Sequence, residues 1–112
     1  MLPTENPALQ KLLAEFRERL VLEFGARVIE VKLFGSYARG TAREDSDIDV
    51  AVVLDRVDSH AERTFPMRLA GDLTIHHGLV IVPLVLSKQE LEFLRAREEL
   101  IAENIDREGI AL

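Results

Sequence analysis

The stretch that decides both the fold and the chemistry is residues 33–50, which read LFGSYARGTAREDSDIDV. An apolar strand runs into the bend Gly35-Ser36, and ten residues later Asp47 and Asp49 open a second strand. Glycine at the end of a strand lets backbone N–H groups approach a ligand closely, and serine adds a hydroxyl donor. A short helical turn is expected after the bend, with its amide dipoles pointing to the same place. This geometry suits the oxygen atoms of a phosphate group.

The two acids of this stretch form a candidate metal site. Because side chains alternate across a strand, the carboxylates of Asp47 and Asp49 lie on one face and Ile48 lies on the other. Two like charges held this close repel each other unless a cation lies between them. Oxygen ligands beside a phosphate pocket suit Mg2+, which binds one or two carboxylates together with substrate phosphates. The alternative is that the acids cap a turn and face water, but the neighbouring Gly35-Ser36 bend favours the metal site.

Outward from this stretch, three segments have the apolar spacing of helices. Asn6 as N-cap and Pro7 start the first helix, the second is predicted over 60–77, and a capping box of Ser87 and Glu90 opens a long third helix. The apolar face of the first helix consists of Leu9, Leu12, Leu13, Phe16, Leu20 and Phe24. The third helix is marked by Leu91, Leu94, Ile101 and Ile105.

Three further segments, 28–34, 48–54 and 79–86, predict strands. The first alternates apolar and charged residues, whereas the second is apolar almost throughout and is therefore expected at the centre of the sheet. Pro83 cannot donate a ladder hydrogen bond, so the third strand is expected at an edge or at a bulge. The apolar tail 109–112 is a candidate last strand. The order α-β-β-α-β-α predicts a small α/β (α+β) sandwich with a mixed sheet packed against helices.

Length and composition narrow the class of protein further. The 112 residues, 47% of them hydrophobic, predict one domain over residues 1–112. A net charge of -6 argues against direct binding of DNA or RNA, whose affinity depends on cationic contacts to phosphates. The chain has no Cys, which excludes disulfides, thiolate zinc sites and thiol catalysis. With no apolar stretch long enough for a membrane span and no signal-peptide layout, a cytoplasmic protein is expected.

Two other motifs share part of the pattern in residues 33–50. Gly35 and Gly40 have the spacing of a P-loop, but Thr41 stands where the P-loop lysine is required. The Asp-x-Asp pair also occurs in phosphatases that resemble haloacid dehalogenases, in which the apolar strand precedes the acids. Here the apolar run 50–54 follows the acids, which places the carboxylates at the wrong end of the strand. Both interpretations are therefore disfavoured.

Gly-Ser, ten residues and then Asp-x-Asp resembles the signature of the minimal nucleotidyltransferase domains of the DNA-polymerase-β-like superfamily. In this sequence the signature consists of Gly35-Ser36 and Asp47-Ile48-Asp49. Residues 38–42 and the closing residues 108–110 also resemble the bacterial and archaeal members. The resemblance covers most of the chain and implies the small nucleotidyltransferase fold.

The resemblance implies transfer of a nucleoside monophosphate, usually AMP from ATP, to an acceptor with release of pyrophosphate. By the same resemblance, Asp47 and Asp49 are the catalytic, metal-binding residues and would hold Mg2+. Gly35 and Ser36 would hold the phosphates of ATP. Arg39 lies close enough to the bend to contact a triphosphate as well. For Arg39, a solvated position or an ion pair with the neighbouring acids at positions 44 and 45 is an equal alternative.

The sequence departs from the fuller family pattern at one position. The family has a third acid on a later strand, which completes a two-metal site and helps to activate the acceptor hydroxyl. The matching position here is near Val82, and the strand 79–86 contains no carboxylate. Asp72 lies on the preceding helix and would substitute only if the fold brought it round. Catalysis is therefore either weakened or dependent on a residue from a partner.

Stand-alone minimal domains of this family usually pair with a small all-helical HEPN protein. Many such pairs act as toxin and antitoxin, in which the nucleotidyltransferase neutralises the HEPN ribonuclease, in some cases by adenylylating it. The resemblance therefore implies an antitoxin with a HEPN-type partner, and the acidic composition fits a protein partner. Two hypotheses remain open: an Mg2+-dependent enzyme that transfers AMP, and a binding module that neutralises its partner by contact.

Overall fold

The structure is a computed structural model, and it describes residues 6–43 and 45–112. Its elements along the chain are α1 (Pro7–Phe24), the 3-10 helix η1 (Gly25–Arg27), β1 (Val28–Phe34), α2 (Ser36–Arg39), β2 (Ile48–Leu54), α3 (His60–His77), β3 (Ile81–Ser87), α4 (Lys88–Ala96), α5 (Leu100–Glu108) and β4 (Ile110–Ala111). The mixed α/β class and the predicted order of the strands and of the first two long helices are confirmed. The short turn expected after the bend is α2, and the candidate last strand is β4.

The four strands form one mixed sheet in the order β3-β2-β1-β4. Strand β1 is antiparallel to β2 and to β4, whereas β2 and β3 are parallel. The apolar strand β2 lies inside the sheet, and β3, which contains Pro83, lies at its edge, as the sequence predicted. Strand β4 pairs with β1 at only two positions, Lys32 with Ala111 and Leu33 with Ile110. This pairing brings the C-terminal residues beside the strand that leads to the Gly35 bend.

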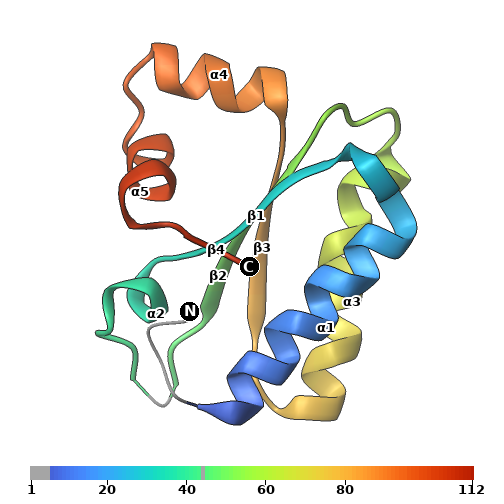
Figure 1. Cartoon of the computed structure of the whole chain (residues 1–112), viewed down its shortest axis with the longest axis vertical. Coiled ribbons are helices and arrows are strands. Elements are labelled where there is room, and N and C mark those ends of the chain that lie inside the picture. The colour runs from blue at the N-terminus through green and yellow to red at the C-terminus, as the bar shows by residue number, and fades with distance from the viewer. Residues whose placement is uncertain (1–5, 44) are drawn as a thin grey trace.

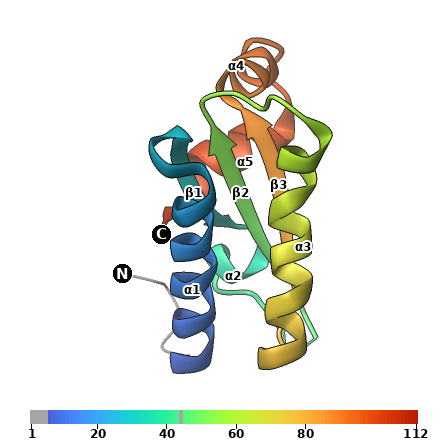
Figure 2. The ribbon, with the colours of Figure 1, turned by 90° about the vertical axis from the view of Figure 1, so that its right-hand side faces the viewer.

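The two faces of the sheet carry different helices (Figures 1 and 2). Helices α1 and α3 cover one face, and α4 and α5 lie against the other. Side chains of β2 alternate between them: Ile48 and Val50 belong to the core under α1 and α3, and Ala51 and Val53 to the core under α4 and α5. Asp49 is two residues before Ala51 on β2, so its carboxylate lies on the same face of the sheet as Ala51, the face of α4 and α5.

The first helix forms as its sequence predicts. Asn6 is the N-cap, and its Oδ1 accepts hydrogen bonds from the backbone N–H groups of Ala8 and Leu9 at 3.0 and 3.3 Å. All six apolar positions predicted for the helix face are buried. None of the helices within the described part of the chain is long and apolar enough to cross a membrane.

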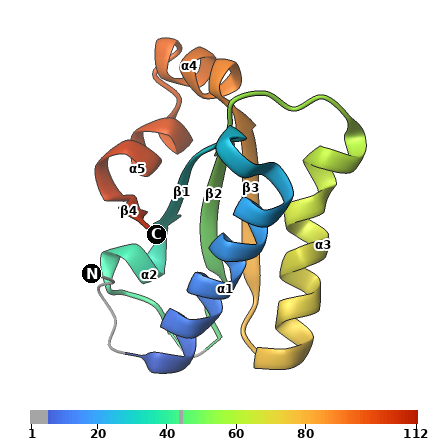
Figure 3. The same cartoon turned by 45° about the vertical axis from the view of Figure 1, so that its right-hand side comes forward.

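The prediction of one long helix after Ser87 is wrong. The capping box of Ser87 and Glu90 is present, but the helix ends at Ala96, and α5 begins at Leu100. Between them Glu98 adopts a positive φ of 55°, a left-handed conformation that ends a helix. Apolar spacing continues across this break, which is why the sequence indicated a single helix. The break turns α5 back along the sheet and leads the chain into β4 (Figure 3).

An ion-pair cluster lies at the end of the sheet where β1 begins. Both terminal nitrogens of Arg27 donate to the carboxylate of Glu62, each at 2.8 Å, and Nη2 also donates to the carbonyl of Arg56 at 2.7 Å. The backbone N–H of Asp58 donates to Glu62 at 2.8 Å. The hydrogen bonds from Arg27 lower the pKa of Glu62 to about 2. The acid is therefore ionised and fully paired in the folded protein.

Candidate functional site

The Gly35-Ser36 bend joins the end of β1 to the one-turn helix α2. Gly35 has φ 76° and ψ -154°, a backbone conformation that only glycine adopts readily. A Cβ atom at this position would overlap the carboxylate of Asp49. The glycine thus allows the bend to form and allows the carboxylate to pack directly against its backbone. The expected proximity of the bend to Asp49 is present.

The register of the sheet explains why Asp49 reaches the bend. Asp49 is the second residue of β2 and is paired with Phe34, the last residue of β1. Asp47 precedes the strand and is exposed, whereas Asp49 is half-buried. Neither carboxylate forms an ion pair or hydrogen bond with any residue that the structure describes. The two acids are therefore available to a ligand.

The electrostatics of the acid pair favour a bound cation. Burial of the Asp49 carboxyl raises its pKa above the ordinary value, and the negative charge of Asp47 raises it further. The positive charge of Arg39 acts in the opposite direction. A divalent cation between the two carboxylates would offset both the loss of hydration and the repulsion. These hard oxygen donors, lying against an open backbone bend, fit Mg2+.

The polar groups around the bend come from α2 and from the C-terminal helix. Arg39, the last residue of α2, donates from Nη1 to Oε2 of Glu108 at 3.0 Å. This partner differs from the alternative expected from the sequence: within the described residues Arg39 is not paired with Asp45, and residue 44 lies outside them. The hydroxyl of Ser36 is half-buried and forms no hydrogen bond in the described part of the chain. Ser36 can therefore donate to a ligand.

Sequence reasoning did not identify Glu108 as part of this site. It noted residues 108–110 only for their family resemblance. The predicted strand in the tail could have indicated this contact. Ile110 pairs with Leu33 in antiparallel β4 and β1, so Glu108, two residues before Ile110, lies near Gly35, two residues after Leu33. A strand prediction with a register would have brought Glu108 to the bend.

The position expected for a third acid is occupied by Val82. Val82 is the parallel neighbour of Asp49 on β3, so the two side chains lie side by side on the same face. Asp72 does not replace the missing acid, because it is exposed on α3, which covers the opposite face of the sheet. Within the described residues no group of three or more His, Cys, Asp and Glu side chains could hold a metal ion. The candidate site is thus a pair of acids.

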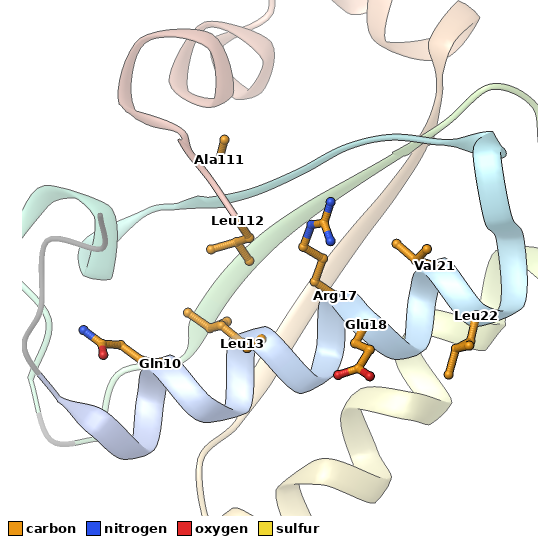
Figure 4. Close-up of a pocket in the computed structure, with 9 residues that line it drawn as sticks. Gln10, Leu13, Arg17, Glu18, Val21, Leu22, Ala111 and Leu112 are labelled. Atoms are coloured by element: carbon orange, nitrogen blue, oxygen red, sulfur yellow. The ribbon is translucent and has the colours of Figure 1, made fainter.

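An apolar groove lies elsewhere on the molecule (Figure 4). Side chains of α1, among them Leu13, Val21 and Leu22, form one wall, and Leu112 at the chain end forms part of the other. None of the predicted site residues lines this groove. The predicted site residues lie instead on the bend, on α2 and around the start of β2.

The sequence matches the family model of the nucleotidyltransferase domain over residues 9–106. Among curated proteins it is similar to "Putative protein adenylyltransferase MJ1305" of Methanocaldococcus jannaschii, with 33% identity in an alignment 96 residues long that covers 78% of this chain and 60% of the relative. It is also similar to "Protein adenylyltransferase MntA" of Thermococcus cleftensis, with 39% identity over 51 residues, which are 46% of this chain and 50% of the relative. This chain therefore spans 60% and 50% of the lengths of these two relatives.

Solved structures share the fold. A "putative minimal nucleotidyltransferase" is 28% identical, with a TM-score of 0.60 over 97% of this chain and 100% of that one. A toxin-antitoxin complex with AMP-PNP contains a chain that is 22% identical, with a TM-score of 0.59 over 87% of this chain and 69% of that one. A complex of tri-AMPylated Shewanella oneidensis HEPN toxin with MNT antitoxin contains a chain that is 20% identical, with a TM-score of 0.54 over 91% of this chain and 70% of that one.

Proposed function

Because this chain belongs to the nucleotidyltransferase-domain family, as the signature in its sequence indicated, we propose that it transfers AMP from ATP to a HEPN-type partner protein and acts as the antitoxin of the pair. The observation that carries this proposal is the placement of Asp49 against the Gly35 backbone, with the charge of Asp47 close to it and, among the residues that the structure describes, no cationic side chain paired with either acid. A structural ion pair would have neutralised these carboxylates.

Each residue of the proposed site has a role that its geometry supports. Asp47 and Asp49 would hold Mg2+, which would supply charge neutralisation at the phosphate oxygens. The open backbone at Gly35 and the hydroxyl of Ser36 receive phosphate oxygens of ATP. Arg39 extends this cradle from the end of α2 and contacts the triphosphate.

The reaction is a displacement at the α-phosphorus. A hydroxyl oxygen of the acceptor forms a bond to this phosphorus, and the bond to pyrophosphate breaks. The hydroxyl proton must pass to a base, and Val82 stands where the family resemblance places a carboxylate. We therefore propose that the partner supplies the base, which would make transfer depend on the complex.

Names of similar proteins support a protein acceptor. The relative from T. cleftensis is named a protein adenylyltransferase, and one structural neighbour is an MNT antitoxin in complex with an AMPylated HEPN toxin. The net charge of -6 fits a protein partner better than a nucleic acid.

A second candidate function is neutralisation of the partner by contact, with only residual nucleotide binding. The observation that favours it is Val82, since a two-acid site lacks the third ligand and base of the fuller pattern. In this case the variant Asp47→Asn/Asp49→Asn would remain folded and still neutralise the partner.

Transfer of label from α-labelled ATP to the cognate HEPN protein tests the first function. We expect label on the partner in the presence of Mg2+ and none with Asp47→Asn. Absence of label on the authentic partner under saturating Mg-ATP would reject the proposal that the protein transfers AMP. Loss of toxin neutralisation in the folded double variant would reject the contact mechanism.

A further inference from the structure

The ion pair between Arg39 and Glu108 joins the proposed site to the C-terminal helix. Arg39 ends α2 and Glu108 ends α5, 69 residues later in the chain. Their side chains are 45% and 31% exposed, so the contact lies at the surface and is open to a ligand from one side. Isolated surface ion pairs contribute little to stability, which leaves room for another role.

The geometry of this contact orients one edge of the guanidinium. Glu108 accepts from Nη1 of Arg39 alone, and Nη2 and Nε have no other partner in the described part of the chain. The edge formed by Nε and Nη2 carries two parallel N–H donors, an arrangement that matches two oxygens of a phosphate. The pair therefore holds one terminal nitrogen of Arg39 and leaves the Nε and Nη2 edge without a partner among the described residues.

The backbone around Glu108 is fixed independently of Arg39. Gly109, the next residue, follows α5 with its N–H donating to the carbonyl of Ile105 at 3.0 Å, and a Cβ there would overlap that carbonyl. Ile110 then pairs with Leu33 on β1. Glu108 is therefore the last residue of a helix that is followed directly by β4, which pairs with β1, the strand that leads into the bend (Figure 3).

We propose that Glu108 is a positioning residue for nucleotide binding: it holds the Arg39 guanidinium by Nη1 so that the Nε and Nη2 edge faces the phosphates of the bound nucleotide. This inference rests on the proposed nucleotide site and adds a residue that the signature does not contain. Glu108 acts only through Arg39, since a carboxylate on its own would repel a phosphate.

A double-mutant cycle on Mg-AMP-PNP affinity, measured by calorimetry, tests the assignment. Arg39→Ala should weaken binding by about tenfold, because hydrogen bonds from a charged donor are lost. Glu108→Ala should weaken binding by about threefold to fivefold in the wild-type background, since a freed guanidinium must be ordered again on binding. In the Arg39→Ala background the same substitution should no longer weaken binding and should strengthen it slightly, because the unpaired Glu108 carboxylate would repel the phosphates.

The matched control is Glu103→Ala, which removes the exposed ion pair of Glu103 with Arg107 on the same helix and should leave affinity unchanged. A loss with Glu108→Ala that persists without Arg39 would overturn the assignment in favour of a purely structural role of α5. Tighter binding by Glu108→Ala in the wild-type background would also overturn it, because Glu108 would then compete with the phosphates for Arg39. If the wild-type protein does not bind Mg-AMP-PNP at all, the proposed function itself fails, whereas normal wild-type binding without coupling between the two positions rejects only the inference.

Discussion

The two ends of strand β1 carry acids in opposite electrostatic states. Where β1 begins, Glu62 accepts two hydrogen bonds from Arg27 and one from the backbone, and its pKa falls to about 2. Where β1 ends, Asp49 is half-buried beside Asp47, and its pKa is raised. Both ends have an arginine close by, but Arg27 binds its acid directly, whereas Arg39 binds Glu108 instead.

This difference distinguishes an acid that stabilises the fold from the two acids that we propose bind a metal ion. The ionised carboxylate of Glu62 has a lower free energy in the folded chain than in the unfolded chain, so its ionisation stabilises the fold. Asp49 is less favourable as an anion in the folded chain, so its ionisation opposes folding until a cation binds. Sites that keep such unpaired charge are typical of function rather than of stability.

The largest expected effect comes from removing the two acidic charges at the end of β1 that carries the proposed site. Asp47→Asn/Asp49→Asn should reduce AMP transfer to the partner by at least about a hundredfold, because the cation ligands are lost. Stability should be unchanged or higher, since a like-charge repulsion is removed. Label transfer and thermal unfolding measure the two effects.

The control for this prediction comes from the other end of β1. Glu62→Gln should retain AMP transfer and lower the melting temperature, the reverse of the site variant. Lower stability in both variants would show that the two ends of the strand do not differ in the way described.

The next largest effect is expected at the bend. Gly35→Ala should destabilise the fold by about 2 kcal/mol or more, because the backbone is unfavourable for alanine and the new methyl group displaces the Asp49 carboxylate. Gly40→Ala is the matched control: its φ is also 76°, but no atom lies within 4 Å of the added carbon, so a cost of about 1 kcal/mol is expected. Denaturant unfolding compares the two. Equal costs would mean that Asp49 does not pack against the bend.

The sequence predicted the candidate site at the end of β1, but it did not predict the ion pair of Arg27 and Glu62 at the start of this strand. The Gly35-Ser36 bend and Asp49 are close in sequence and lie together in the structure, whereas Asp47, which was also expected on the strand, precedes β2. The partners Arg27 and Glu62 are 35 residues apart and meet only because α3 returns along the sheet. Contacts of this kind depend on tertiary packing, which no periodicity records.

The same limit explains the two details that the sequence analysis left out or placed wrongly. The break between α4 and α5 depends on Glu98 adopting a positive φ, for which the sequence has no glycine to signal it. The contact of Arg39 with Glu108 depends on the register of β4, a two-residue strand. Both details follow from how the C-terminal segment packs, whereas the order and type of the long elements follow from local patterns.

A smaller effect is expected when the site end is made more acidic. Val82→Asp places a third carboxylate beside Asp49 and should destabilise the metal-free protein by about 1 kcal/mol, because like charges on neighbouring strands repel. Added Mg2+ should reverse this loss in Val82→Asp but not in Val82→Asn, which has a similar shape without the charge. Unfolding with and without Mg2+ measures the difference. No response to Mg2+ would argue against a metal site at this face.

The smallest effect, and the one that compares the two ends most directly, is the pH dependence of stability without metal. The pKa of Glu62 is about 2 in the folded chain, below its ordinary 4.5, so its contribution is complete above about 4.5 and is lost as the pH falls toward 2. The melting temperature of wild type should therefore exceed that of Glu62→Gln near neutral pH, and the gap should close on acidification.

The pKa of Asp49 is raised above its ordinary 3.8, so its ionisation destabilises the fold above that value. Asp49→Asn should therefore melt above wild type near neutral pH, and this gap of opposite sign should also close as the acid becomes protonated. Gaps of the same sign would mean that both acids serve the fold.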